Sequence, residues 1–550
     1  MPIPLPAPDA ERRRALDALA SEQFDVLIIG GGITGAGIAR DAALRGLRVA
    51  LVERDDFASG TSSRSSRLVH GGLRYLEHGK LGLVFESSRE RRTLLRIAPH
   101  LVRPLSFVWP VYSGARIARG KLSLALTLYD ALALFRNVGR HERLDARGVL
   151  TREPRLSGSR LLGGARYWDA ATDDARLTLS TALSAQRAGA TMLNHARVAE
   201  LIRDGQRIMG ARVEDTETDA LVDVRARVVV NATGPWSDRI EEMAHVGSAA
   251  GVRGSKGVHV SVRRARVGNV SALALTAPQD GRVMFVLPAG AFTIIGTTDT
   301  FDAVAPEEVR ATTRDVDYLL AAANHYFVDA HLTEADVVSA WAGLRPLAAA
   351  SGSDSDPGSM SREHAITETS PGLVSVTGGK LTTYRAMSAQ VVDVVQRVLS
   401  VAKTPSRTAS EPLSGGDIVD VASAIAEATR TVGDSAVGER LVHAHGSAWR
   451  SVWALGEELP EMRERITPGL PYLLAELRHA VEHELARTLS DLLIRRTPLA
   501  FEMEDHGRDA ARRVVPYVGK WLGWSDAAAS AAVARYDGDI ARLFTITPVA

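Results

Sequence analysis

The chain has 550 residues, a formal net charge of +1 and no cysteine, with 45% hydrophobic and 24% charged residues. Its length suggests about two to four domains. The lack of cysteine excludes disulfides, thiolate metal sites, a cysteine nucleophile and a cysteine-linked flavin, and the near-zero charge gives no reason to expect a nucleic-acid partner.

The chain begins without a recognisable targeting signal. Residues 1–10 are proline-rich and have no apolar core, so we expect no secretory signal. Residues 11–20 have the pattern of a short helix that leads into the first strand.

A β–α–β unit follows. Residues 25–30 (DVLIIG) form an apolar, β-branched run that ends in glycine, which predicts a buried parallel strand. A helix is expected to about Arg45, with Gly46 after it, and residues 48–53 (RVALVE) predict the second strand. This unit predicts a doubly wound sheet.

The most apolar stretch, residues 122–135 (LSLALTLYDALALF), is interrupted by Asp130. It is shorter than the roughly 18 uncharged residues that a membrane span needs, so we predict no transmembrane helix. The basic residues around it are Arg116, Arg119, Lys121 and Arg136. The sequence does not decide whether this segment is a buried helix or a helix that dips into a membrane surface.

Further strands suggest a second sheet inserted between parts of the first. Strand-then-glycine units recur at residues 225–234 and 372–379. Between them lie the strand-like segments 257–263, 282–288 and 292–297. Residues 405–416 are rich in Pro, Ser and Gly and predict a linker, after which the pattern is helical to the end.

The first predicted strand leads into a dinucleotide fingerprint, Gly30-Gly31-Gly32-Ile33-Thr34-Gly35. Gly30 permits the tight turn, Gly32 lets a pyrophosphate approach, and Gly35 lets the helix pack on the strand. Glu53 ends the second strand, where its carboxylate can accept a hydrogen bond from a ribose hydroxyl. We therefore predict dinucleotide binding.

The hydroxyl-rich residues 54–66 after Glu53 favour FAD over NAD, because they can follow a longer dinucleotide. Two more strands end in glycine, at residues 231–234 (NATG) and at Gly378-Gly379. Each would bring a further stretch of backbone close to the dinucleotide. A helix that begins near Leu381 would stabilise the negative charge of a reduced flavin.

Several segments of the chain resemble one family, the FAD-dependent, quinone-linked, membrane-associated glycerol-3-phosphate dehydrogenases. They are residues 24–79, 98–104 (APHLVRP), 172–177 (TDDARL), 230–236 (VNATGPW), 256–260 (KGVHV), 294–300 (IIGTTDT), 342–347 (AGLRPL), 377–388 (TGGKLTTYRAMS) and 479–501. The resemblance runs from about residue 20 to 525. The first 20 residues and residues 349–362 depart from it.

The resemblance implies an α/β fold for the oxidoreductase region and an α+β class for the whole chain. It implies a Rossmann-like FAD-binding domain that is interleaved with a β-sheet substrate domain. A C-terminal all-helical cap domain is expected to follow. We expect an N-terminal extension at 1–20, the oxidoreductase region at 21–404, a linker at 405–416 and the helical domain at 417–550. The FAD-binding parts are expected at about 21–115, 165–245 and 340–404, and the substrate-domain parts at about 116–164 and 246–339.

The family likeness also implies a set of residues that contact FAD. They are Gly30, Gly32, Ile33, Thr34, Gly35, Glu53, Arg54, Thr61, Ser62, Ser63, Ser66, His70, Gly71, Gly72, Val198, Thr233, Gly234, Gly379, Lys380, Leu381 and Thr382. His70 is expected to be structural or to contact the flavin.

The implied substrate is sn-glycerol 3-phosphate, whose phosphate carries about −1.5 to −2 charges and needs several cations or donors. The matched motifs supply Arg74, Tyr75, Arg345 and Lys380. Lys380 is one of only six lysines, which favours a role that arginine cannot fill.

The implied reaction is oxidation of a secondary alcohol to dihydroxyacetone phosphate, with hydride transfer from C2 to flavin N5. His259 is the candidate general base, and its alternative is a structural histidine in the substrate-domain sheet. Arg345 is expected to stabilise the developing alkoxide, and Thr298 and Asp299 to shape the site.

The resemblance further implies a membrane quinone as electron acceptor and a protein attached peripherally to the cytoplasmic face of the cell membrane. We predict no metal site, and the sequence leaves a homodimer open. Two other functions remain: an FAD-dependent amino-acid or 2-hydroxyacid oxidoreductase, and a flavin-binding scaffold without turnover.

Overall fold

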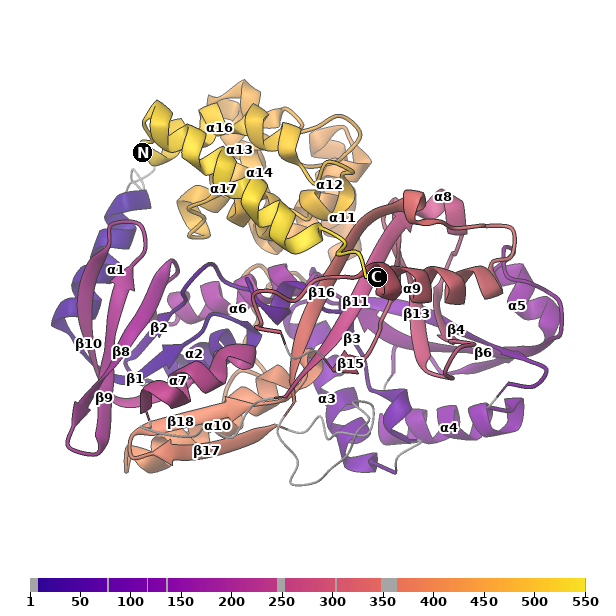
Figure 1. Ribbon diagram of the computed structural model, residues 1–550, viewed down its shortest axis with the longest axis horizontal. Helices are drawn as coiled ribbons and strands as arrows, with labels where there is room; N and C mark the ends of the chain where they lie inside the picture. Colours follow the sequence, from indigo (N-terminus) through magenta and orange to yellow (C-terminus); the bar gives the residue numbers. More distant parts are fainter. Residues whose placement is uncertain are drawn as a thin grey trace.

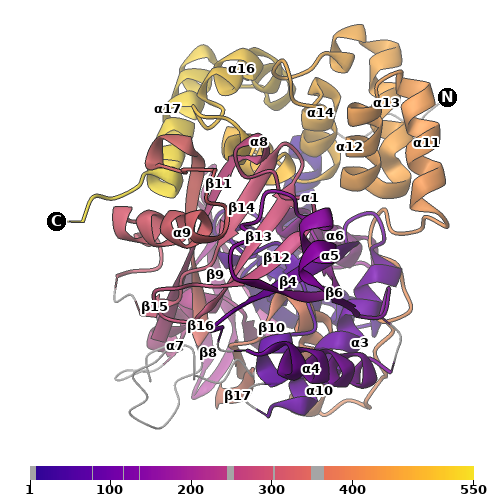
Figure 2. The ribbon, with the colours of Figure 1, turned by 90° about the vertical axis from the view of Figure 1, so that its right-hand side faces the viewer.

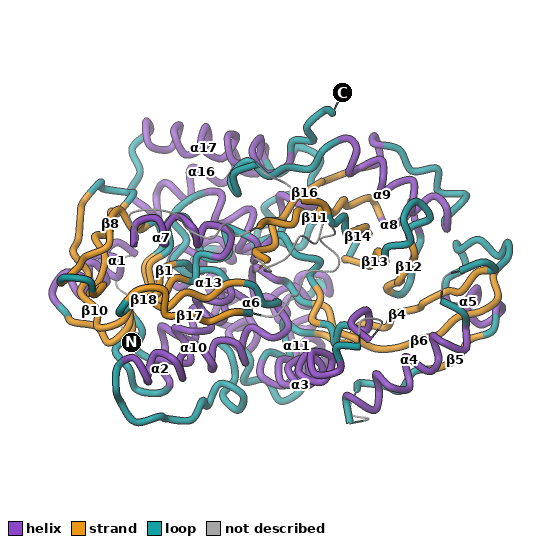
Figure 3. Tube along the Cα trace, turned by 60° about the horizontal axis from the view of Figure 1, so that its bottom comes forward, coloured by secondary structure: helices purple, strands orange, loops and turns teal. Residues whose placement is uncertain are grey.

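The computed structural model describes residues 8–76, 79–115, 117–134, 137–244, 253–301, 304–347 and 364–549, apart from the side chains of Pro8, Arg74, Arg253 and Leu347. Two β-sheets lie side by side, and a helical C-terminal domain lies above both in the view of Figure 1. Figure 3 shows the strands of the two sheets as separate groups.

The first sheet is built around parallel strands, as predicted. Its main path is β17 (Ala365–Ser370), β18 (Leu373–Thr377), β10 (Ala220–Asn231), β1 (Gln23–Ile29), β2 (Val49–Val52) and β7 (Thr191–Leu193). The antiparallel strands β8 (Ala196–Asp204) and β9 (Arg207–Asp215) extend it from β10.

Both faces of this sheet are covered, which explains why its strands read as continuous apolar runs. In β1, Val26 and Ile28 pack with one set of helices, whereas Leu27 and Ile29 pack with β8, β9 and α1. The helices on the first face are α2 (Ile33–Leu44), α6 (Asp174–Arg187) and α10 (Tyr384–Val398), and those on the second are α1 (Pro8–Ser21) and α7 (Ser237–Ala244).

The second sheet is mostly antiparallel. Its main path is β15 (Thr300–Phe301), β11 (Arg253–Arg263), β14 (Phe292–Gly296), β13 (Val283–Ala289), β12 (Ala272–Thr276), β4 (Arg103–Tyr112), β6 (Leu161–Ala171) and β3 (Leu68–Val69). Strand β16 (Val337–Leu347) pairs with β11, and β5 (Glu142–Leu144) pairs with β6. The helices α5 (Ala146–Arg152), α8 (Arg264–Val267) and α9 (Thr313–Tyr326) accompany it.

This sheet begins earlier and ends later in the chain than the expected boundaries at residues 116 and 339. Strands β3 and β4 precede the first boundary, and most of β16 follows the second. The two prolines in β4 interrupt its strand pattern, and the glycine and proline in β16 do the same, so pattern alone did not assign them.

The C-terminal domain is helical, as predicted, and residues 405–416 before it contain no helix or strand. Its helices are α11 (Val421–Val432), α12 (Ser435–His445), α13 (Trp449–Glu458), α14 (Leu474–His483), α15 (Leu499–Glu502), α16 (Arg508–Leu522) and α17 (Asp526–Phe544), with a π-helical turn, η8 (Asp491–Arg496), between α14 and α15.

Helices α3 (Leu81–Ile97) and α4 (Arg119–Leu132) lie on the side of the molecule opposite this domain (Figure 2). Leu122 and Leu126 of α4 are buried, but Leu124 between them is 71% exposed. Within the described ranges, none of the helices combines the length and the apolar character needed to cross a membrane.

Candidate active site

A cavity of about 730 Å³ lies between the two sheets. The carboxyl ends of β1, β2 and β10 form one wall, and strands β11, β13 and β16 form the opposite wall. Ligands of doubly wound folds bind at the carboxyl ends of the strands, so this cavity is the candidate active site.

The glycine turn after β1 is built for close approach. Gly30 has φ +108°, and a Cβ atom there would lie 2.7 Å from the carbonyl oxygen of Ala232. Gly32 precedes α2 and has no side chain to cap it. The Ile33 N–H donates to the Ser62 hydroxyl at 2.9 Å, and the next N–H groups of the first turn are those that a ligand can use. A helix N-terminus with this geometry is suited to a phosphate.

Glu53 is fixed beside this turn. One of its carboxylate oxygens accepts from the Gly31 N–H at 2.6 Å, and the other accepts from the Asp55 N–H at 2.9 Å. Burial, followed by the charge of Asp55, raises the pKa of this carboxyl above its ordinary value. The two oxygens retain lone pairs for a ribose hydroxyl, so the turn and Glu53 together fit a dinucleotide such as FAD.

Most residues predicted to contact FAD line the cavity. They are Gly30, Gly32, Ile33, Thr34, Glu53, Arg54, Thr61, Ser62, Ser66, His70, Val198, Thr233, Gly234, Gly379, Lys380, Leu381 and Thr382. Gly35, Ser63, Gly71 and Gly72 do not line it. Gly35 and Gly71 instead provide close packing, against the Gly30 carbonyl and the Tyr129 hydroxyl, and the Ser63 hydroxyl bonds the Gly60 carbonyl.

The register between β11 and β16 sets the opposite wall. Ser255 lies opposite Arg345, and His259 lies opposite Trp341. Because side chains alternate along a strand, these residues point to the cavity side, while Val258 and Ala342 between them pack into the core behind the sheet. Gly257 leaves room for the Arg345 side chain, which any Cβ atom there would meet.

Arg345 is held by three hydrogen-bond acceptors. Its Nη1 donates to Asp299 Oδ1 at 3.0 Å and to the Ser255 hydroxyl at 3.3 Å, and its Nη2 donates to the Thr297 hydroxyl at 3.1 Å. The Arg345 side chain is 23% exposed, toward the cavity. The guanidinium is therefore oriented in advance of a ligand.

His259 is buried in the same wall. Its Nε2 lies 2.8 Å from the Ser66 hydroxyl, and its ring stacks on Trp341 with a centroid distance of 5.5 Å. Burial, followed by the charges of Arg345 and Arg67, lowers its pKa to about 3. The ring is therefore neutral near pH 7, and a neutral imidazole can accept a proton.

Lys380 and Tyr75 also meet at the cavity. The Lys380 ammonium lies 3.8 Å from the centroid of the Tyr75 ring, a cation–π contact. The backbone N–H of His70 donates to the Thr382 hydroxyl at 3.1 Å, which ties the two flavin-side segments together. The predicted side chain of Arg74 lies outside the described part of the chain.

The sequence did not single out several lining residues. Trp236 stands at the cavity with the Arg54 guanidinium 5.4 Å from its ring centroid. A group of aromatic residues from the second sheet also contributes: Phe107, Trp109, Tyr167 and Phe285. The alternation of Phe107 and Trp109 in a strand was the available signal, but β4 itself was not predicted.

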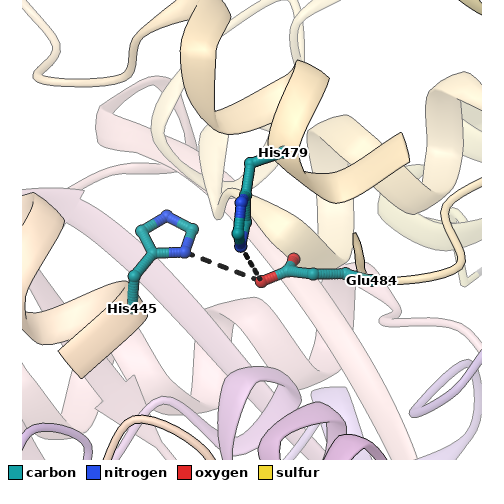
Figure 4. A group of neighbouring side chains, drawn as sticks. All are labelled: His445, His479 and Glu484. Carbon is teal, nitrogen blue, oxygen red and sulfur yellow. Dashed lines mark ion pairs between the residues drawn. The ribbon is translucent and has the colours of Figure 1, made fainter. Parts of the chain in front are cut away.

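Outside the cavity, His445, His479 and Glu484 form a buried cluster (Figure 4). His445 Nδ1 and His479 Nε2 lie 3.6 and 3.9 Å from the same oxygen of Glu484. The Arg176 guanidinium donates to both Glu484 oxygens, at 2.7 and 2.9 Å. Arginine thus provides the positive charge that a metal ion would bring, and the cluster serves as a buried ion pair.

Two family descriptions match the chain. "FAD dependent oxidoreductase" covers residues 25–385, and "C-terminal domain of alpha-glycerophosphate oxidase" covers residues 406–529. The second match begins at residue 406, so it includes nearly all of residues 405–416.

Relatives match over nearly the whole chain. "Glycerol-3-phosphate dehydrogenase 2" of Mycobacterium tuberculosis H37Rv is 41% identical, over 96% of this chain and 90% of its own. "Aerobic glycerol-3-phosphate dehydrogenase" of Bacillus subtilis is 35% identical, over 94% and 95%. The FAD complex of the glycerol-3-phosphate dehydrogenase from Bacillus halodurans superposes with a TM-score of 0.81 at 32% identity, over 98% of both chains.

Proposed function

Because the chain belongs to the FAD-dependent glycerol-3-phosphate dehydrogenase family, we propose that it oxidises sn-glycerol 3-phosphate to dihydroxyacetone phosphate. Bound FAD, held by the glycine turn and Glu53, supplies the hydride acceptor. The rest of the chemistry is assigned to residues of the protein: Arg345 of the opposite wall binds the substrate together with Lys380 and Tyr75 of the flavin-side segments, and His259 of the opposite wall takes the hydroxyl proton.

The proximity of Arg345 and His259 is the observation that carries this proposal. Loss of hydride from C2 requires the C2 hydroxyl to give up its proton to a base. Arg345 is oriented to stabilise negative charge on that oxygen. The proton passes to the His259 ring, and the electron pair of the C2–H bond leaves as hydride.

The two other candidate functions have weaker support. A carboxylate substrate, as in amino-acid or 2-hydroxyacid oxidoreductases, needs one arginine, whereas this cavity offers both Arg345 and Lys380. A scaffold without turnover has no need of an oriented arginine beside a neutral buried histidine.

Anaerobic mixing of the purified flavoprotein with glycerol 3-phosphate tests the function. We expect bleaching of the flavin absorbance near 450 nm, with one dihydroxyacetone phosphate formed per flavin. Bleaching by an amino acid or a 2-hydroxy acid, but not by glycerol 3-phosphate, would reject the proposed substrate. If none of the three compounds bleaches the flavin, the remaining candidate is a flavin-binding scaffold without turnover.

We further propose a membrane quinone as the electron acceptor, with the protein attached peripherally to the cytoplasmic face of the membrane. The support is a set of exposed apolar residues on two helices that contact each other, which we call the α3–α4 surface and define by Leu81, Phe85, Leu124 and Leu128. Their exposed fractions range from 39% to 71%. Lys121 shares the α4 face at helical spacing and can contact anionic lipid.

Replacing both exposed leucines of α4 with aspartate (Leu124→Asp with Leu128→Asp) is expected to weaken binding to anionic phospholipid vesicles about 100-fold. Withdrawing two leucines from the bilayer costs about 3 kcal/mol or more. Vesicle co-sedimentation measures the loss, and reduction of a soluble dye by glycerol 3-phosphate should persist.

Leu221→Asp is the matched control, because Leu221 is 61% exposed but lies on β10, far from α4 (Figure 1). Equal vesicle binding by all three proteins would contradict the proposed surface. The acceptor is tested separately: hydrogen peroxide formed in air in proportion to turnover, without reduction of a short-chain quinone, would indicate an oxidase.

A further inference from the structure

The carboxylate of Asp56 joins the FAD-binding loop to the C-terminal domain. Asp56 lies three residues after Glu53 and is fully buried. One of its oxygens accepts from Arg495 Nε and from Arg496 Nη1, both at 2.6 Å. The other accepts from Arg496 Nη2 and from Asn194 Nδ2, both at 3.0 Å.

The two arginines are anchored in the C-terminal domain. Both belong to the π-helical turn η8, about 440 residues along the chain from Asp56. Arg495 also donates to Asp491 Oδ1 at 2.6 Å, and Arg496 donates to the carbonyl oxygen of Glu484 at 2.7 Å. These contacts exist only while the C-terminal domain is docked on the first sheet.

The residues around Asp56 shape the dinucleotide site. Phe57 packs beside Gly31, and the Ala58 N–H donates to the Gly31 carbonyl oxygen at 3.1 Å. Glu53, on the other side of Asp56, accepts from the Gly31 N–H. The segment that the two arginines hold is therefore the segment that fixes both the glycine turn and the ribose acceptor.

Breaking these contacts from either side would leave buried charge without its partner, either the Asp56 carboxylate or the Arg495 and Arg496 guanidinium groups, which is strongly destabilising. The loop and η8 would then separate so that the unpaired charge reaches water, and Glu53 and Phe57 would no longer be held beside Gly31. Docking of the C-terminal domain and the loop conformation that binds FAD are therefore coupled, so that each favours the other.

We infer that the C-terminal domain is part of the FAD-binding apparatus: Arg495 and Arg496 act through Asp56 as positioning residues for the glycine turn and Glu53. By reciprocity, FAD must stabilise docking of the C-terminal domain by the same factor by which docking improves FAD affinity. The domain thus has a role in holding the cofactor that does not depend on which substrate is oxidised.

Asp56→Asn tests this inference, because it removes the charge and keeps the shape of the side chain. Titration of the deflavinated full-length protein with FAD is expected to show a Kd raised about 5- to 150-fold, the usual range for coupling between sites. The matched control is Asp41→Asn, since Asp41 is also fully buried and pairs with an arginine, Arg45, at 2.6 Å. Asp41 does not contact residues 53–66, so its variant should keep the FAD affinity.

Hydrogen exchange supplies a readout that simple loss of stability would not produce. The N–H groups of Arg487 and Thr488 donate to Asp491 Oδ2, at 2.8 and 3.0 Å, and report on the docked segment. We expect FAD to slow the hydrogen exchange of these two N–H groups in the parent protein and in Asp41→Asn. In Asp56→Asn the slowing by FAD should be smaller.

An unchanged FAD Kd in Asp56→Asn, with a melting temperature lowered as in Asp41→Asn, would overturn the inference and reduce Asp56 to a structural ion pair. Should Asp56→Asn fail to fold, Arg495→Gln takes its place, because it leaves the Arg496 contacts with Asp56 in position. A smaller increase in Kd is then expected, and no increase again overturns the inference.

Discussion

Arg345→Met should lower kcat/KM for glycerol 3-phosphate about 10²- to 10³-fold while FAD remains bound. The guanidinium is held by Asp299, Ser255 and Thr297 before any ligand arrives, so its charge can act on the substrate without reorganisation. Loss of a positioned charged partner costs about 2–5 kcal/mol, and about 1.4 kcal/mol corresponds to tenfold. Steady-state assays with a soluble dye measure the change.

Arg345→Lys separates charge from geometry in the same assay. Lysine keeps the positive charge but cannot contact Asp299 and Thr297 together, so we expect intermediate activity. Arg239→Met is a control, because Arg239 also borders the cavity but forms an exposed ion pair with Glu307. A similar loss in Arg239→Met, or full activity in Arg345→Met, would contradict the role of Arg345.

His259→Gln is expected to lower kcat about 10²- to 10⁴-fold, the usual contribution of a general base. The glutamine amide can still bond with Ser66 but cannot take up a proton. Rapid-mixing measurement of flavin reduction follows the affected step directly. Ser66→Ala is the comparison, since it removes one neutral hydrogen bond to the ring and should cost about tenfold or less.

The pH dependence of kcat/KM distinguishes titration of His259 from titration of the substrate phosphate. Because its pKa is lowered to about 3, His259 is already neutral in the free protein from pH 5 to 9. A fall of kcat/KM on the acid side near pH 6 is therefore assigned to protonation of the substrate phosphate, whose second pKa is about 6. That acid limb should remain in His259→Gln. Its disappearance in the variant would show that the ring titrates in this range.

Local pattern was sufficient for the dinucleotide half of the site. The apolar run before Gly30, the glycine spacing and Glu53 at the end of the next strand are all readable within about 30 residues. The parallel sheet, the inserted second sheet and the helical C-terminal domain followed from the same kind of pattern, and the structure confirms them.

The opposite wall could be predicted only in part, because it depends on register between distant strands. His259 and Arg345 were identified through family motifs, but their relation arises from the pairing of β11 with β16, which sequence spacing does not reveal. The contact of Asp56 with Arg495 and Arg496 spans most of the chain and has no local signal. Pattern alone does not predict strands β4 and β16, because proline and glycine interrupt them.

The connectivity of the first sheet has a consequence for synthesis. The wall beside Gly30 comes from β10, which pairs with β18 as well as with β1 and β9, and the partners of Asp56 follow more than a hundred residues after β18. A chain emerging from the ribosome therefore carries the complete glycine motif long before the surrounding pocket can close. Contacts this far apart in sequence form slowly, so cofactor loading belongs to the last stage of folding, and chains that terminate before residue 496 should emerge without a retained flavin.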